Sequence, residues 1–319
     1  MIRSRLAAAG LAVAFVLATV AVTSPSELQA AEPNRGSFDC STIGGLDYLL
    51  KERTVLLLGE IHGTVESPQF VADLLCNAVA SGRSAALALQ LPEFESGVIA
   101  RYLDSEGSRD DRRRLLADAH ELTRYLDGRF SESMVALLES IRALRAQGGE
   151  VELRLFVPPD VDSVTRQNLT AVERPMAVAV WEAIEELDAD LFIALTGLTH
   201  NRMIPGSETD PDYKPMGFRL SQWNPEWRLL SLALAHSGGT AWMCTTQHEN
   251  DCLAVPITGG GWGEPNSIYI YGEVAETGYD GFYYVGNISH SPPARTDMVE
   301  VTFEEETVTE LPFEQTPEF

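Results

Sequence analysis

Two histidines and a glutamate follow short apolar runs in this sequence, at positions where side chains can do chemistry. Glu60 and His62 lie two residues apart in LLLGEIHGTVE (56–66), and His200 follows a later apolar run, LFIALT (191–196). Alternate residues of an extended backbone point the same way, so Glu60 and His62 can act as a pair. Such a pair can take a proton from water, or all three side chains can hold a divalent metal with an open water position. Both kinds of chemistry are typical of hydrolases.

The elements that must position these side chains are alternating strands and helices. The apolar run 54–58 (TVLLL) predicts a strand that is covered on both faces. Ser67-Pro68 predicts the start of a helix, which Gly82 ends, and a second apolar run follows at 85–91. Together these segments predict a parallel βαβ unit. The carboxyl ends of parallel strands form the ligand-binding edge of an open sheet, and we expect the Glu-x-His pair to lie there.

The rest of the chain continues this alternation and carries no separating linker. The late aromatic and β-branched runs predict strands at an antiparallel edge. The predicted fold class is therefore α/β, with a mostly parallel central sheet flanked by helices, in a single domain over 31–319. The expected helices are 95–147, 174–187 and 218–236, and the expected further strands are 150–157, 191–196, 239–244, 267–272, 281–285 and 299–303.

The N-terminus has the pattern of a secretory signal peptide. Arg3 and Arg5 precede an apolar run (6–22), and small residues follow as far as Ala30. We predict a signal peptide over 1–30. An uncleaved membrane anchor is the alternative, although the run is at the short end of a membrane span. The expected location is exported, either periplasmic or secreted, with no membrane contact after cleavage.

The four cysteines fit an oxidising compartment, where an even number of cysteines indicates disulfides. Cys244 and Cys252 flank the polar segment TTQHEND and are expected to close a local loop. Cys40 and Cys76 would then join the mature N-terminus to the first helix. Because no Cys-x-x-Cys spacing occurs, a thiolate zinc site is not predicted.

The net charge argues against two classes of partner. The full chain carries a formal charge of −24, and removal of the signal peptide deletes two arginines and one glutamate. A surface this acidic repels nucleic-acid phosphates and anionic lipid head groups. We therefore expect a small-molecule or peptide substrate and no nucleic acid.

Other polar residues end the predicted strands as well. Gln90 lies inside the second apolar run, and Glu93 and Glu95 follow it. Polar residues at strand ends often only satisfy loop amides, so a structural role and a catalytic role both stay open. We predict Glu60, His62 and His200 as catalytic residues, with Glu93 in a supporting role.

The segment Gly59-Glu60-Ile61-His62-Gly63-Thr64-x-Glu66 resembles a motif of the superfamily that contains erythromycin esterases, ChaN-type haem-binding proteins and Tiki/TraB proteins. That superfamily also has a Gly-x-x-His segment after a later strand, which Gly197-Leu198-Thr199-His200 matches. PMGFRL (215–220) and GGTAWMC (238–244) resemble the later part of secreted members. The resemblance covers roughly residues 54–255.

This resemblance implies an α/β fold with the histidines facing one cleft. In the esterase branch, the residues at Glu60, His62 and His200 support water attack on a lactone ester. In the Tiki branch, similar groups bind a divalent metal for peptide hydrolysis, whereas the ChaN branch binds haem without turnover. We therefore expect an exported hydrolase-like protein acting on an ester or amide, with or without a metal at Glu60, His62 and His200. A haem- or iron-binding protein without catalysis is the alternative.

The chain departs from the esterase pattern at two places. Esterase-like members have a glutamate in a Leu-Glu-x-Pro pattern at the end of the second strand, and Gln90 occupies that position here. An amide is no base and a poor metal ligand, so Glu93 or Glu95 replaces that carboxylate or the step is lost. The arginine of the esterase branch on the first helix is also absent from 67–81.

Overall fold

The computed structural model describes residues 38–124, 126–159, 169–207, 210–223, 227–244, 251–272 and 274–295. All of these residues belong to one unit, 36–319. The predicted signal peptide (1–30) and the predicted strand at 299–303 lie outside the described residues. Within the described ranges, no helix has the length and apolar character needed to cross a membrane.

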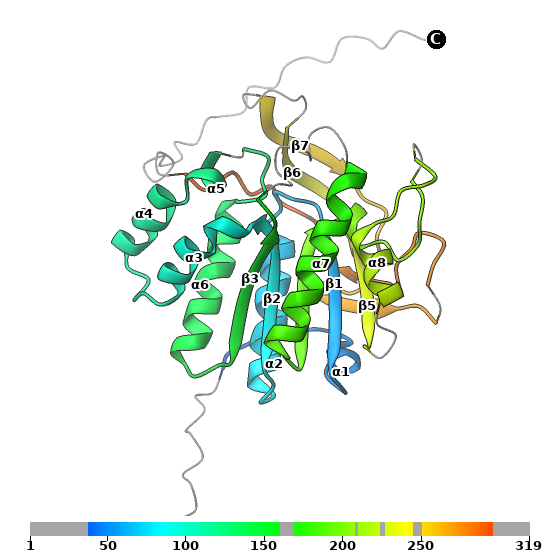
Figure 1. Ribbon diagram of the computed structural model, residues 1–319, viewed down its shortest axis with the longest axis horizontal. Helices are drawn as coiled ribbons and strands as arrows, with labels where there is room; N and C mark the ends of the chain where they lie inside the picture. The colour runs from blue at the N-terminus through cyan, green and yellow to red at the C-terminus, as the bar shows by residue number, and fades with distance from the viewer. Residues whose placement is uncertain are drawn as a thin grey trace, which may run out of the picture. The chain divides into compact units, whose positions relative to one another are not determined.

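In the described part of the chain, a seven-stranded sheet forms the centre of the fold (Figure 1). Its order is β3-β2-β4-β1-β5-β9-β8, with parallel neighbours throughout except for the antiparallel pair β8 and β9. The predicted α/β class, with a mostly parallel sheet and an antiparallel edge, is confirmed. The strands are β1 (Thr54–Glu60), β2 (Ala85–Pro92), β3 (Val151–Val157), β4 (Leu191–Gly197), β5 (Leu229–Ala235), β8 (Ser267–Ile270) and β9 (Gly281–Tyr284).

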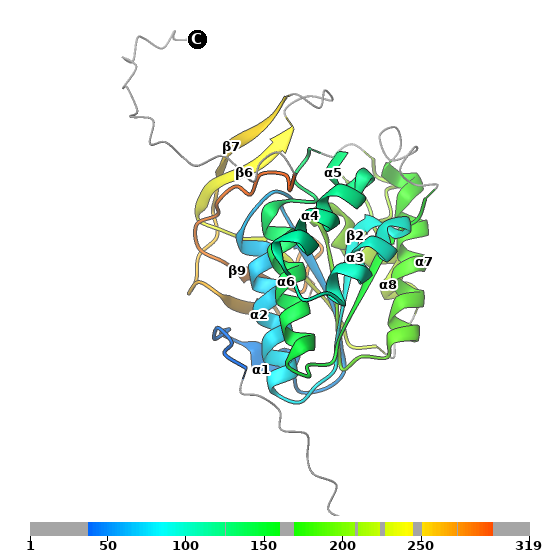
Figure 2. The same ribbon diagram turned by 90° about the vertical axis from the view of Figure 1, so that its left-hand side faces the viewer.

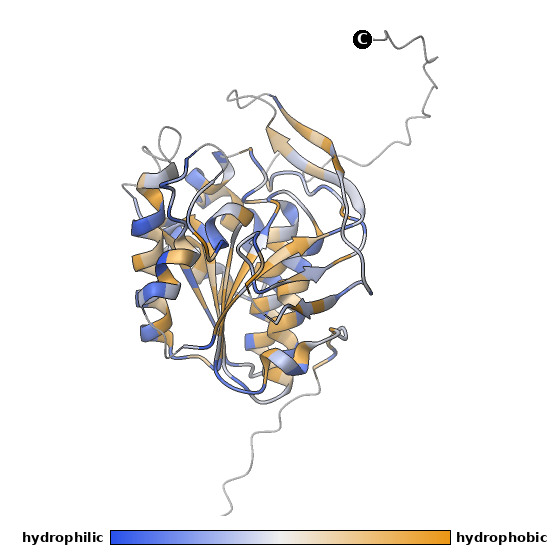
Figure 3. Ribbon diagram, turned by 90° about the vertical axis from the view of Figure 1, so that its right-hand side faces the viewer, coloured by the Kyte–Doolittle hydropathy of each residue, from blue (hydrophilic) through white to orange (hydrophobic). Residues whose placement is uncertain are grey.

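Helices cover both faces of this sheet, which is why its central strands are apolar on both sides. On one face, Leu56 and Leu58 of β1 pack into a core with α2 and α6, which lie side by side (Figure 2). On the other face, α7 and α8 cover Val55 and Leu57. Figure 3 shows apolar strands between these layers. The helices are α1 (Leu46–Leu49), α2 (Glu66–Ala80), α3 (Ser96–Leu103), α4 (Arg109–Asp118), α5 (His120–Arg124), α6 (Glu132–Ala146), α7 (Leu169–Leu187) and α8 (Met216–Trp223), with 3-10 turns η1 (Glu93–Glu95) and η2 (Leu198–Asn201).

Residues 229–235 form strand β5, so the prediction of a helix over 218–236 is wrong for its second half. Helix α8 ends at Trp223, and LLSLALA then runs parallel to β1 inside the sheet. Leucine and alanine favour helices locally, and this segment has no β-branched residue. Its position between β1 and β9 decides the outcome, because Ser231 and Leu232 are completely buried there.

Helix α2 begins at Glu66, and Val65 rather than Ser67 occupies its N-cap position. The predicted cap at Ser67 is therefore wrong. The Ser67 hydroxyl is buried and accepts a hydrogen bond from the Tyr283 hydroxyl at 3.1 Å, so it serves the core instead of the helix end. Glu66 supplies a negative charge in the first turn, where the helix dipole favours it.

Strands β6 (Gly238–Cys244) and β7 (Cys252–Thr258) form an antiparallel hairpin of their own. The hairpin lies at the top of Figure 1, on the side where the parallel strands end. β6 agrees with the strand predicted over 239–244, whereas β7 was not predicted. Pro256 lies within β7, and a proline inside an apolar run argues against a strand unless that strand lies at a sheet edge, as here.

Both predicted disulfides are present. Cys40 is bonded to Cys76 of α2, and Cys244 is bonded to Cys252, which stands opposite it in the hairpin register. Two disulfides are consistent with an exported protein, because such bonds persist in oxidising compartments.

We expect loss of the Cys40–Cys76 bond to cost more stability than loss of Cys244–Cys252. The bonded residues are 36 and 8 positions apart, and the entropy that a disulfide removes from the unfolded chain grows with that separation. The decrease in the free energy of unfolding should be about 4 kcal/mol for Cys40→Ser/Cys76→Ser and about 2.5 kcal/mol for Cys244→Ser/Cys252→Ser. Urea unfolding measures both, and the reverse order would contradict the prediction.

Candidate active site

The carboxyl ends of three adjacent strands bring the predicted site residues together. β4 lies between β1 and β2, and Glu60, the last residue of β1, pairs with Gly197, the last residue of β4. His62 follows Glu60 by two residues, and His200 lies in the η2 turn directly after β4. Gln90 lies near the end of β2. Segments that are far apart in the sequence therefore deliver two histidines to one edge of the sheet.

Glu60 and His62 form a hydrogen-bonded pair. Oε1 of Glu60, a residue that is only 5% exposed, lies 2.9 Å from Nδ1 of His62. A carboxylate oxygen accepts hydrogen bonds, so in this pair a proton lies on Nδ1 of His62. Ile61, between the two, packs against the core that contains Leu56 and Leu58.

His200 has a carboxylate partner of its own, from a helix on the far face of the sheet. Its Nδ1 lies 2.6 Å from Oε1 of Glu173, a fully buried residue of α7. Glu173 also accepts hydrogen bonds from the Tyr213 hydroxyl and from the Met216 backbone N–H, at 2.7 Å for the latter. Burial and the neighbouring Glu173 charge raise the pKa of Tyr213, so its phenol stays protonated and donates. Three donors thus compensate the buried carboxylate.

Glu173 is not among the predicted site residues, because the helix predicted from the sequence begins only at 174, whereas α7 begins at Leu169. One signal marks it as different from the other glutamates of α7. Glu173 lies three, four and seven residues before Met176, Ala177 and Val180, which are buried, so it occupies the apolar face of the helix. A carboxylate on such a face needs a buried partner, and His200 is that partner.

The two histidine rings border one small space above Gly197. A Cβ added to Gly197 would lie 3.2 Å from His62 Nε2, 3.6 Å from His200 Cδ2 and 3.9 Å from Gln90 Oε1. The missing side chain therefore leaves room between the two rings. Since each Nδ1 is bonded to a carboxylate, the Nε2 atoms are the nitrogens available for chemistry.

Gln90 ties two strands together at this space. Its Oε1 accepts a hydrogen bond from the Gly197 N–H at 2.9 Å, so the amide oxygen must face β4. The amide NH2 group then faces Met176, whose sulfur lies 4.0 Å away. An amide in this position cannot take a proton from water.

The two glutamates after β2 have different surroundings. Glu95 is 5% exposed, and its Oε1 accepts from the Glu121 N–H at 2.9 Å, so it stabilises the N-terminal end of α5. The Glu93 side chain is exposed in η1. A supporting role of Glu93 in the site stays a prediction.

The loop between α5 and α6 adds two charged residues near His62 that the sequence analysis misses. Nε of Arg129 donates to Oδ2 of Asp127 at 2.8 Å, and a second guanidinium nitrogen lies 2.6 Å from the same oxygen. Burial raises the pKa of Asp127, but the charge and hydrogen bonds of Arg129 and the charge of His62 outweigh it and hold that pKa below its usual value. Arg129 lines a cavity together with Gln90, so it supplies a guanidinium near the site. Helix α2, where the esterase branch has an arginine, contains none.

The described residues do not present a ligand set for a resident metal ion. Among them, no group of three His, Cys, Asp or Glu side chains is arranged to hold a metal ion. Glu60 and His62 bond to each other instead of presenting separate ligand atoms to a common point with His200.

Comparisons with known proteins support the fold. No protein-family model and no curated protein matches the sequence. A mutant of erythromycin esterase EreC in its open conformation is 13% identical, with 67% of this chain and 78% of that chain covered and a TM-score of 0.51. A succinoglycan biosynthesis protein is 10% identical, with 77% and 91% covered and a TM-score of 0.53.

This chain has a fold similar to those of erythromycin esterase EreC and the succinoglycan biosynthesis protein. The resemblance in the Gly59–Glu66 and Gly197–His200 segments is thereby confirmed as a likeness of fold. ChaN of Campylobacter jejuni, solved with cofacial haem, is 13% identical over 67% of this chain and 91% of that chain, at a TM-score of 0.35. At that score the ChaN structure carries no argument about haem in this chain.

We expect Glu173→Ala to lower the free energy of unfolding by about 3–5 kcal/mol, because His200, Tyr213 and a backbone N–H lose a buried acceptor. Tyr213→Phe removes only one donor and should cost about 1 kcal/mol. The control, Glu182→Ala, changes an exposed glutamate of the same helix and should stay within about 0.5 kcal/mol of wild type. Urea unfolding tests all three. Equal effects of the two alanine variants would contradict a buried carboxylate network.

Proposed function

We propose that this chain is an exported hydrolase that adds water to an ester or amide bond of a small-molecule or peptide substrate. One observation carries the proposal. The rings of His62 and His200 border the same space above Gly197, and each has a buried carboxylate on its Nδ1. A histidine held by a carboxylate in this way is the arrangement that hydrolases use to move a proton to and from water.

His62 acts as the general base. Its Nε2 carries the lone pair and takes one proton from a water molecule, whose oxygen attacks the carbonyl carbon of the substrate. The imidazolium that forms is stabilised by Glu60, which holds Nδ1–H at 2.9 Å. When the tetrahedral intermediate collapses, His62 returns this proton to the leaving alcohol or amine. The exposed quarter of the His62 side chain (26%) allows water to reach it.

His200 stabilises the negative charge that develops on the carbonyl oxygen. In this role the imidazole carries a proton on each ring nitrogen, and its Nδ1–H donates to the fully buried Glu173, which fixes the ring. Nε2–H is then free to donate to the oxyanion. In this proposal the base and the oxyanion donor both border the space at Gly197.

Export is supported by two kinds of observation. The N-terminal segment has the composition of a signal peptide, and the chain contains two disulfides. The acidic surface supports an uncharged or cationic substrate in place of nucleic acid.

We expect His62→Ala to lower kcat/KM for ester hydrolysis by about 100- to 10,000-fold, because the general base is lost. His200→Ala should lower it by about 100-fold, because an oxyanion donor is lost. His120→Ala changes an exposed histidine and serves as the control. Rates on p-nitrophenyl esters and on a fluorescent peptide mixture, with and without chelator, provide the measurement, and the chelator should have no effect.

Two outcomes would overturn this proposal. One is wild-type protein that hydrolyses no member of either panel. The other is unchanged turnover in both the His62→Ala and the His200→Ala protein. A haemin titration on the same proteins tests the alternative. A Soret band that both substitutions weaken, in a protein without turnover, would favour haem binding.

Gly197→Ala tests the space itself. The added Cβ would lie 3.2 Å from His62 Nε2, tighter than ordinary contact, so the ring must shift away from its working position. A displacement of this kind should lower kcat/KM by about 10- to 100-fold. Gly260→Ala is the matched control, because a Cβ at Gly260 has no neighbour within 4 Å. If Gly197→Ala retained full activity, the reaction would have to occur elsewhere.

A further inference from the structure

The site has one carboxylate fewer at its strand ends than the esterase pattern leads one to expect. Gln90 supplies an amide near the end of β2, and its oxygen accepts a hydrogen bond from the Gly197 N–H. The Glu95 carboxylate accepts a hydrogen bond from the Glu121 N–H at the N-terminal end of α5. A positive charge that forms on His62 during the reaction therefore receives no compensation from β2.

Asp127 brings a carboxylate to this place from a loop. The Gly63 N–H, directly after His62, donates to the Gly128 carbonyl at 3.2 Å. A Cβ on Gly128 would lie 2.6 Å from the Gly63 Cα, so the two backbones are in direct contact. Asp127 and its partner Arg129 flank Gly128, and Arg129 lines the same cavity as Gln90. The Asp127–Arg129 pair therefore lies in the neighbourhood of both His62 and Gln90.

Trp242 of the hairpin holds both loops in place. Its indole N–H donates to the Leu126 carbonyl at 2.8 Å, next to Asp127. Its backbone N–H donates to the Gly63 carbonyl at 2.9 Å, next to His62. One residue thus connects the loop that carries Asp127 to the loop that carries the base.

We propose that Asp127 is the second carboxylate of this site, and that it stabilises the positive charge that forms on His62. The inference rests on the proposed hydrolase function. It goes beyond that function because it assigns to Asp127 the negative charge that an amide at Gln90 cannot provide. Asp127 does not take up the proton itself. It remains an ionised carboxylate through its contacts with Arg129, and its side chain is one-third exposed, open to the water that the reaction uses. Asp127 is therefore a positioning and electrostatic residue that acts through His62.

The test compares full-length mature wild type, Asp127→Asn, Gln90→Glu and the double variant on p-nitrophenyl acetate. Asp127→Asn keeps the side-chain shape and an acceptor for the Arg129 N–H, but removes the charge. We expect kcat to fall by about 10- to 100-fold with KM nearly unchanged. Adding Gln90→Glu to Asp127→Asn should restore kcat by about tenfold, because it returns a carboxylate next to Gly197. A purely structural role of Asp127 would not be rescued in this way.

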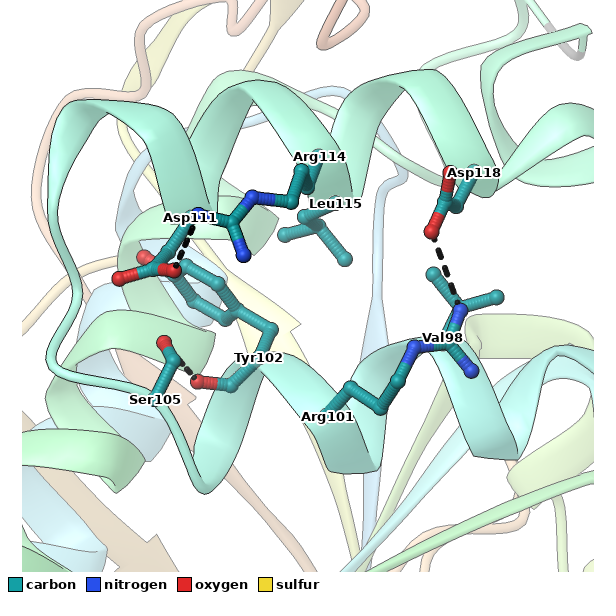
Figure 4. Close-up of a pocket in the computed structure, with 8 residues that line it drawn as sticks. All are labelled: Val98, Arg101, Tyr102, Ser105, Asp111, Arg114, Leu115 and Asp118. Carbon is teal, nitrogen blue, oxygen red and sulfur yellow. Dashed lines mark hydrogen bonds and ion pairs between the residues drawn. The ribbon is translucent and has the colours of Figure 1, made fainter.

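The matched control is another aspartate–arginine pair, between two other helices. Asp118 of α4 and Arg101 of α3 form an ion pair at 3.1 Å across a surface pocket (Figure 4). The residues that line this pocket include no histidine. Asp118→Asn should leave both kcat and KM at the wild-type values.

A second readout separates this inference from the proposed function. The ring signals of His62 in the NMR spectrum, assigned with His62→Ala, should shift in Asp127→Asn and stay in place in Asp118→Asn. Wild-type protein without turnover would sink the hydrolase proposal, and the NMR comparison would still decide whether Asp127 acts on His62. Wild-type kcat in Asp127→Asn, or unmoved His62 signals, would overturn the inference. If Asp127→Asn does not fold, Asp127→Ser, which keeps an acceptor, takes its place.

Discussion

The pairing of β1 with β4 is the constraint on which the site depends. The register Glu60↔Gly197 places the end of β4 directly beside the end of β1, and β2 with Gln90 lies on the other side of β4. A slip of one residue would turn Glu60 to the other face of the sheet and separate it from Gly197. The space between the histidine rings exists because the residue at that register position is a glycine.

Each histidine of the site is held by a carboxylate that is itself buried. Glu60 is 5% exposed and Glu173 is fully buried, so both would be costly without partners. Glu173 solves this with three donors from η2, from the segment before α8 and from the α8 backbone. A buried network of this kind is rigid only when every member is satisfied, and it orients a ring without making contact with substrate.

Loops supply the remaining groups, and backbone contacts hold these loops in place. Gly63 has a φ of +72° and donates to one segment while accepting from two others, Trp242 and Ser291. A side chain at Gly63 would collide with the Trp242 carbonyl, so only glycine permits this close approach. The disulfide-closed hairpin, the segment before Ala294 and the α5–α6 loop therefore meet around the histidine loop, as expected of functional loops on a rigid sheet.

The sequence by itself determined the α/β class, most of the parallel strands, both disulfides and the placement of Glu60, His62 and His200 at one sheet edge. These features can be predicted because apolar runs and strand ends are visible in short stretches of sequence, and because the number and spacing of the cysteines are read directly from it. The strand β5 and the partners Glu173, Tyr213 and Asp127 were decided by the tertiary structure alone. A Leu/Ala run becomes a strand only when it is buried between two others. A glutamate on α7 meets His200 only because α7 packs across the sheet, and the loop that carries Asp127 approaches the histidine loop only because two glycine backbones touch. Such contacts join residues tens to more than a hundred positions apart, and no local pattern encodes them.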